Sequence, residues 1–180
     1  MEFIKTTFEG LIIIKPKIFS DERGYFFESF NKPEFAQAGI NIEFVQDNQS
    51  LSQINVLRGL HFQCPPFEQG KLVRVLNGSV LDVVVDIRKN SPTYGKYFSI
   101  ILTEKEKNML YIPPGFAHGF LTLENNTVFS YKCTNVYNKS SEDAILWNDP
   151  TLGISWGVTN PVISEKDRKA QTFSTFKSPF

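Results

Sequence analysis

Two β-branched runs around Asn77-Gly78 constrain the fold of this chain more than any other feature. Residues 72–76 precede the dipeptide and residues 80–87 follow it. Asn-Gly between two such runs is the strongest short-range signal for a β-hairpin. In the second run one face is wholly apolar, and the other mixes valines with aspartates, which is the period-two pattern of a strand. The sequence therefore predicts a hairpin at this point and a fold rich in β-structure.

The rest of the chain indicates further strands and only short helices. Asn31 and Ser164 are candidate N-caps of two short helices, and Gly39 is a candidate stop for the first. No strand alternates with a long helix, which argues against a doubly wound α/β fold. We therefore expect an all-β antiparallel sandwich or barrel with a few short helices. Further strands are expected at 97–102, 109–112, 119–123 and 128–136.

Length and charge narrow the class of protein. With 180 residues and no repeat or linker, the chain is expected to form a single domain, 1–180. Lys and Arg total 19, as do Asp and Glu, and this balance argues against a general nucleic-acid or anionic-membrane binder. The apolar run at 11–14 is too short for a signal peptide or a membrane span. We expect a cytoplasmic protein.

The scarcity of histidine and cysteine argues against a metal site. The only histidines are His61 and His118, whereas a metal-dependent β-barrel site needs two or three histidines and a carboxylate. Cys64 and Cys133 lack zinc-site spacing and are read as small buried or half-buried residues. Dinucleotide, P-loop and nucleophile-elbow motifs are absent too. We expect no metal and no cofactor, so an enzyme built on this chain would use acids, bases and the reactivity of its substrate.

Three stretches place polar residues where a β-core favours apolar ones. Arg58 and His61 lie among Leu, Gly and Phe, and His118 follows a Pro-Pro-Gly turn between aromatic residues. Polar groups in such surroundings are either buried with partners or line a pocket. Tyr131 and Tyr137 flank a polar strand. Taken singly, each of these residues also fits a structural role, and the sequence pattern leaves that alternative open.

A series of short motifs runs in order over nearly the whole chain. The motifs lie at 19–24, 27–28, 46–50, 57–63, 69–73, 86–88, 91–95, 113–120, 131–132, Tyr137, Glu142, 147–150 and 164–167. Each motif is weak alone, but the ordered set resembles the dTDP-4-dehydrorhamnose 3,5-epimerase family. The resemblance implies a cupin-type jelly roll, a homodimer with strand exchange, and no cofactor.

The resemblance also implies a reaction. Family members invert C3 and C5 of dTDP-4-dehydro-6-deoxy-D-glucose, whose C4 ketone acidifies the hydrogens on both carbons. Epimerisation then needs a base on one face and a proton donor on the other. By resemblance His61 is the base, Asp167 orients it, and Tyr131 is the acid. Lys71 stabilises the enolate oxygen.

Binding roles follow from the same resemblance. Arg58 holds the substrate and its charge, and Arg23 reaches the diphosphate from the partner subunit. Tyr137 stacks on thymine. The remaining expected contacts to nucleotide and sugar are Glu28, Gln46, Asp47, Asn48, His118, Glu142 and Lys166.

Two alternatives remain open at this stage. One is a C3-only epimerase or a ketoisomerase acting on a related nucleotide sugar, which would share the same base and acid. The other is a non-enzymatic, carbohydrate-binding cupin module. A binding module has no need for a His, a Tyr and a Lys in one pocket, so their juxtaposition would favour an enzyme.

Overall fold

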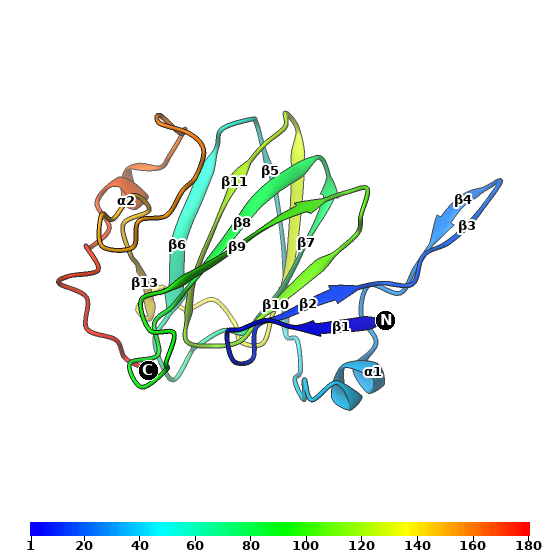
Figure 1. Cartoon of the computed structure of the whole chain (residues 1–180), viewed down its shortest axis with the longest axis horizontal. Coiled ribbons are helices and arrows are strands. Elements are labelled where there is room, and N and C mark those ends of the chain that lie inside the picture. The colour runs from blue at the N-terminus through cyan, green and yellow to red at the C-terminus, as the bar shows by residue number, and fades with distance from the viewer.

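The computed structural model describes residues 1–180, and antiparallel β-strands form most of it. Two sheets pack face to face, and a separate two-stranded hairpin projects from one side of the molecule (Figure 1). This architecture confirms the predicted all-β sandwich. Neither of the two helices has the length and apolar character needed to cross a bilayer.

The strands divide between the sheets as follows. The six-stranded sheet has the order β1 (Glu2–Lys5), β2 (Ile12–Lys15), β10 (Met109–Ile112), β7 (Lys71–Asn77), β12 (Thr127–Cys133), β5 (Gln46–Ser52). The five-stranded sheet has the order β13 (Glu142–Ala144), β6 (Leu57–Gln63), β11 (Phe116–Thr122), β8 (Ser79–Asp86), β9 (Tyr97–Thr103). The projecting hairpin consists of β3 (Phe19–Asp21) and β4 (Gly24–Phe26).

Apolar side chains fill the space between the sheets and cover both outer faces. Val73 and Phe129 from the larger sheet meet Val84 and Phe120 from the smaller one in the central core. The C-terminal segment packs Trp156 and other apolar residues over the five-stranded sheet. Helix α1 (Lys32–Gln37) packs Phe35 under the six-stranded sheet. The polar residues that line the site gather around two adjoining cavities, described below.

The prediction of a β-hairpin at Asn77-Gly78 is wrong. Strand β7 pairs with β10 and β12, whereas β8 pairs with β11 and β9, so the chain crosses between the sheets at Gly78. The glycine is still required, since its φ is +81° and an added Cβ would lie 2.5 Å from the Oγ1 of Thr127. Asn-Gly fixes the reversal of the chain. Burial of both faces of β8 decides that the strands enter opposite sheets.

The other predicted elements are confirmed, with shifted ends. Strands β9, β10, β11 and β12 occupy the expected segments, although β12 ends at Cys133. Asn31 caps α1 by accepting a hydrogen bond from the backbone N–H of Glu34, and Ser164 caps α2 (Glu165–Arg168) in the same way. Strands β5 and β6 were not predicted. Their cavity-facing positions are polar, which removes the alternation of apolar residues that marks a strand.

Candidate active site

Two adjoining cavities open between the sheets and share one group of residues. Their volumes are about 590 and 340 Å³, a size range typical of small-molecule sites. His61, Lys71, Tyr131 and Glu142 line both. The cavities therefore form one site with two compartments and a common centre. No cluster of three or more His, Cys, Asp or Glu side chains in residues 1–180 is arranged to hold a metal ion.

His61 of β6 is bound to a carboxylate from a distant part of the chain. Its Nε2 lies 2.7 Å from Oδ1 of Asp167, 106 residues away on α2. Burial raises the pKa of Asp167. Hydrogen bonds from His61, the Gly59 backbone and the Ser164 hydroxyl outweigh burial and leave that pKa below its ordinary value. A charged Asp167 thus holds the imidazole with Nε2–H as donor, and Nδ1 remains as the basic nitrogen.

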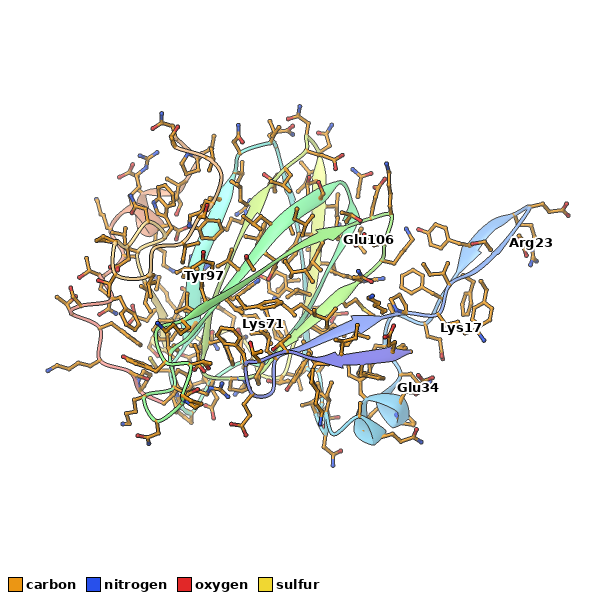
Figure 2. The ribbon with its side chains drawn as sticks, viewed as in Figure 1. Lys17, Arg23, Glu34, Lys71, Tyr97 and Glu106 are labelled. Atoms are coloured by element: carbon orange, nitrogen blue, oxygen red, sulfur yellow. The ribbon has the colours of Figure 1, made fainter.

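Tyr131 and Lys71 face His61 from the opposite sheet. Tyr131 lies on β12 and Lys71 on β7, whereas His61 lies on β6 of the five-stranded sheet. Burial raises the pKa of the Tyr131 phenol, which keeps it protonated at neutral pH. Burial lowers the pKa of the Lys71 ammonium, and neighbouring acidic groups oppose that shift. Figure 2 labels Lys71 inside the body of the sandwich. A base and a proton donor therefore stand on opposite walls, with a cation nearby.

Glu142 links three elements at the boundary between the compartments. Its Oε2 accepts a hydrogen bond from Oη of Tyr137 at 2.7 Å and lies 2.5 Å from Nζ of Lys166. Burial by itself raises the pKa of Glu142. The contacts with Lys166 and Tyr137 outweigh burial and leave that pKa below its ordinary value, so the group is ionised. Tyr137 is 54% exposed, which leaves its ring available for stacking.

Strand β5 presents a polar face to the smaller compartment. Gln46 donates from Nε2 to Oδ1 of Asn48 at 3.0 Å and accepts from the backbone N–H of Tyr137 at 2.8 Å. Asp47 points the other way, because side chains alternate along a strand. Its carboxylate pairs with Lys132 at 2.8 Å and lines neither cavity. The structure thus brings Gln46 and Asn48 to the site but not the side chain of Asp47.

The larger compartment contains two further residues predicted from the sequence. Arg58 lines it and donates from Nε and Nη2 to the Ser52 hydroxyl at 3.3 and 3.2 Å. His118 lines it as well, and its Nε2 lies 2.9 Å from Oδ2 of Asp82. As expected, His118 lies among aromatic residues. The centre of its ring is 6.2 Å from that of Phe129 and 6.4 Å from that of Phe120.

Besides Asp47, two further predicted residues lie outside both cavities of this chain. Arg23 is at the tip of the projecting hairpin (Figure 2), where its side chain is 85% exposed and its guanidinium pairs with Asp21. Glu28 is exposed and accepts a hydrogen bond from Asn31 at 3.1 Å. Neither touches the site from its own chain.

Several residues that line the site were missed from the sequence. The hydroxyl of Ser50 is buried, without a hydrogen-bond partner, in the wall of the larger compartment. Its signal was the repetition of polar residues at every second position of β5. Most of the others fall within the family motifs, but the sequence did not mark them as lining residues, because their contact with the site depends on packing between distant strands. The further lining residues are Val56, Leu57, Phe62, Gln63, Gln69, Phe120, Val162, Ile163 and Ser164.

A family model and individual sequences point to the same family. The family model described as dTDP-4-dehydrorhamnose 3,5-epimerase matches residues 5–175. The dTDP-4-dehydrorhamnose 3,5-epimerase of Shigella flexneri is 51% identical over 174 residues, which cover 96% of this chain and 96% of that protein.

Solved structures agree with the sequence comparison. The dTDP-6-deoxy-D-glucose-3,5-epimerase of Legionella pneumophila, solved with dTDP-4-keto-L-rhamnose, superposes with a TM-score of 0.93. It is 47% identical, and the match covers 98% of this chain and 94% of that one. A 3′-monoepimerase of Streptomyces bikiniensis, solved with dTDP-quinovose, has a TM-score of 0.91 at 33% identity, with 96% and 88% covered. The fold is thus the cupin-type jelly roll of these enzymes.

Proposed function

The chain belongs to the dTDP-4-dehydrorhamnose 3,5-epimerase family, and from this membership we propose how its own side chains perform the reaction. The enzyme is an isomerase that inverts C3 and C5 of dTDP-4-dehydro-6-deoxy-D-glucose. The C4 ketone of this substrate accepts the electrons released when a proton leaves C3 or C5. Catalysis therefore requires a base, an opposed acid and a group that stabilises the enolate oxygen.

The observation that supports these roles is the opposed placement of His61 and Tyr131 across one cavity. Nδ1 of His61 removes the proton, and the Nε2–H bond to Asp167 stabilises the imidazolium that forms. The electron pair moves onto O4 of the substrate, opposite the ammonium of Lys71. Tyr131 then donates its phenolic proton to the other face of the same carbon. Proton exchange with water restores both groups, so no cofactor is consumed.

The rest of the site fits the two parts of a nucleotide sugar. The sugar occupies the common centre, where His61, Lys71 and Tyr131 converge. The exposed ring of Tyr137 stacks on the thymine, and Gln46 and Asn48 provide polar contacts in the same compartment. The diphosphate joins the thymidine to the sugar, so it has to lie between Tyr137 and the common centre, where Lys166 pairs with Glu142. Arg58 lines the larger compartment and adds a positive charge for the substrate.

We propose in addition that the enzyme is a homodimer joined by the β3–β4 hairpin. Phe19, Tyr25 and Phe26 of the hairpin are 52%, 60% and 66% exposed in the single chain, an apolar surface typical of an interface. Arg23 at the tip of the hairpin has no anionic partner beyond Asp21. An exchanged hairpin would bring Arg23 to the diphosphate in the partner's site and Glu28 close to it.

The reaction is tested by an NMR time course in heavy water with dTDP-4-dehydro-6-deoxy-D-glucose. We expect deuterium to enter both C3 and C5, with inversion at each. Uptake at C3 alone would contradict the 3,5-assignment and indicate a monoepimerase, like the relative from Streptomyces bikiniensis.

The variant His61→Asn tests the acid–base roles in the same experiment. We expect turnover to fall by about 10²–10⁴-fold, the usual range for loss of a general base, while binding of dTDP persists. Unchanged turnover would contradict the role of His61. Binding without any deuterium uptake by the wild-type protein would instead support a carbohydrate-binding module.

A further inference from the structure

Gln63 is a buried amide that the proposed reaction does not use. It is the last residue of β6, is only 5% exposed and lines the smaller compartment two residues after His61. Its side chain forms three hydrogen bonds, each to the backbone of a segment without regular structure. Nε2 donates to the carbonyls of Phe67 and Val136 at 2.6 and 3.1 Å, and Oε1 accepts from the N–H of Asn138 at 2.8 Å. Gln63 therefore connects a strand of the active site to two neighbouring loops.

Two of these bonds hold the residues on either side of Tyr137. The segment 134–141, between β12 and β13, has no regular structure, and Tyr137 is 54% exposed, so packing alone fixes its ring weakly. Its own N–H donates to Oε1 of Gln46 at 2.8 Å, and its hydroxyl donates to Oε2 of Glu142 at 2.7 Å. Backbone groups of three consecutive residues, 136–138, are thus held by two glutamines, one from each sheet.

The partners of Gln63 require a carboxamide at this position. A carboxamide offers two N–H donors and an acceptor, which match the two carbonyls and the one N–H that surround it. A carboxylate of the same shape would place its lone pairs against both carbonyls, and a thioether would form none of the three bonds. Buried backbone groups that lose their partners carry a large desolvation penalty, so the loop would move to reach water. The geometry of residues 136–138 therefore depends on glutamine at position 63.

We propose that Gln63 is a positioning residue, which holds the main chain of residues 136–138 so that the ring of Tyr137 is in place before a nucleotide binds. The inference rests on the proposed stacking of Tyr137 on thymine. A loop that is already ordered loses less conformational entropy when a ligand binds, so this preorganisation raises affinity. Gln63 has no part in the proton transfers between His61, Tyr131 and the sugar. Its loss should therefore weaken binding of the nucleotide and leave the chemical step unchanged.

The test is a double-mutant cycle between Gln63→Met, which keeps the length of the side chain, and Tyr137→Ala. Calorimetric titration with dTDP should show affinity about tenfold weaker in Gln63→Met, with KM raised to match and kcat within about twofold of the wild type. In the Tyr137→Ala background the same change should have little effect, because no ring remains to be positioned. The matched control is Gln171→Met. Gln171 donates to Asp143 of β13 at 2.7 Å and lines neither cavity, so its loss should lower stability and leave dTDP affinity unchanged.

Amide hydrogen exchange of the protein without ligand gives a second readout that needs no activity. We expect slow exchange at the N–H groups of Tyr137 and Asn138, and fast exchange at the neighbouring Lys139, whose N–H has no acceptor. Exchange at Asn138 should become at least about tenfold faster in Gln63→Met. Should Gln63→Met fail to fold, Gln63→Glu replaces it in both experiments, since it keeps the acceptor for Asn138 and loses only the two donors. Fast exchange at Asn138 in the wild type would overturn the proposal.

Two outcomes of the cycle would also overturn it. One is an equal loss of dTDP affinity with and without the Tyr137 ring, and the other is a fall in kcat with KM unchanged. The single variants separate this inference from the proposed function. If Tyr137→Ala binds dTDP weakly and Gln63→Met binds it as the wild type does, only the role of Gln63 fails. If Tyr137→Ala binds dTDP as tightly as the wild type, the proposed stacking itself fails.

Discussion

At the scale of single residues, the two histidines show how the same contact produces different chemistry. Each binds a buried carboxylate through Nε2, His61 to Asp167 and His118 to Asp82. The side chain of His61 is 32% exposed and that of His118 only 7%. A base must return its proton to water after each turnover, and only His61 is open enough to do so. The difference in exposure therefore supports His61 as the base and leaves His118 for binding.

The opposed acid can be tested by Tyr131→Phe, which removes one hydroxyl and keeps the ring. His61 should still remove a proton from C3 and return a deuteron to the same face, so deuterium enters without inversion. Inversion should fall by about 10²–10⁴-fold, as for other losses of a general acid. Proton NMR of the sugar in heavy water follows both processes in one sample. Inversion at the wild-type rate would show that another group protonates the second face.

At the scale of elements, the connection from β8 to β9 depends on one carboxylate. Asp86 accepts from Arg88 at 2.7 Å and from the hydroxyls of Ser91 and Thr93 at 2.6 Å each. Burial raises the pKa of Asp86, but these hydrogen bonds outweigh it and leave the pKa below its ordinary value. The turn between the two strands is therefore held by an ionised group.

A depressed pKa makes this connection sensitive to acid. Its contribution to stability is full above the unfolded-state pKa of about 3.9 and is lost as the pH falls through the lower folded-state pKa. We expect Asp86→Asn to lower the free energy of unfolding at pH 7 by about 3 kcal/mol and to weaken the loss of stability in acid. Urea unfolding at a series of pH values measures both effects. An equally steep loss below pH 4 in the variant would assign the acid sensitivity to other carboxylates.

Elements also show where sequence patterns succeed and where they stop. The caps Asn31 and Ser164 act on N–H groups within their own helical turn, so the sequence located both helices. The dipeptide Asn77-Gly78 is equally local, and it predicted the reversal of the chain. It did not predict which sheet receives β8, because that depends on apolar partners far along the chain.

At the scale of the whole molecule, the β3–β4 hairpin is the part whose aromatic side chains are not buried within the single chain. It extends away from both sheets (Figure 1) and exposes aromatic residues, and Arg23 lies at its tip. In the proposed dimer each site would combine His61 of one subunit with Arg23 of the other. Two defective variants should then complement each other.

Mixing Arg23→Ala with His61→Asn tests this arrangement. Arg23→Ala alone should bind substrate more weakly, and His61→Asn alone should be inactive. Random exchange of subunits should restore about a quarter of the sites to wild type, since half of the dimers contain one complete site. The activity of mixtures refolded together, compared with that of each variant alone, measures the effect. No gain on mixing would place Arg23 in its own subunit's site or outside the site altogether.

The sequence by itself determined the strand-rich fold class, the helix caps and the order of the family motifs. The strand patterns and the caps depend on residues within one strand or one turn, and each motif is a short run of neighbouring residues. Only the tertiary structure decided that β7 and β8 enter different sheets and that Asp47 faces outward. It also brought Asp167 to His61 from 106 residues away, a contact that the sequence indicated only through the family resemblance. It alone brought Asp82 against His118, although in the sequence Asp82 is one polar residue in a β-branched run. The physical reason is range, because propensities and caps act between neighbours in sequence, whereas burial and charge act between neighbours in space.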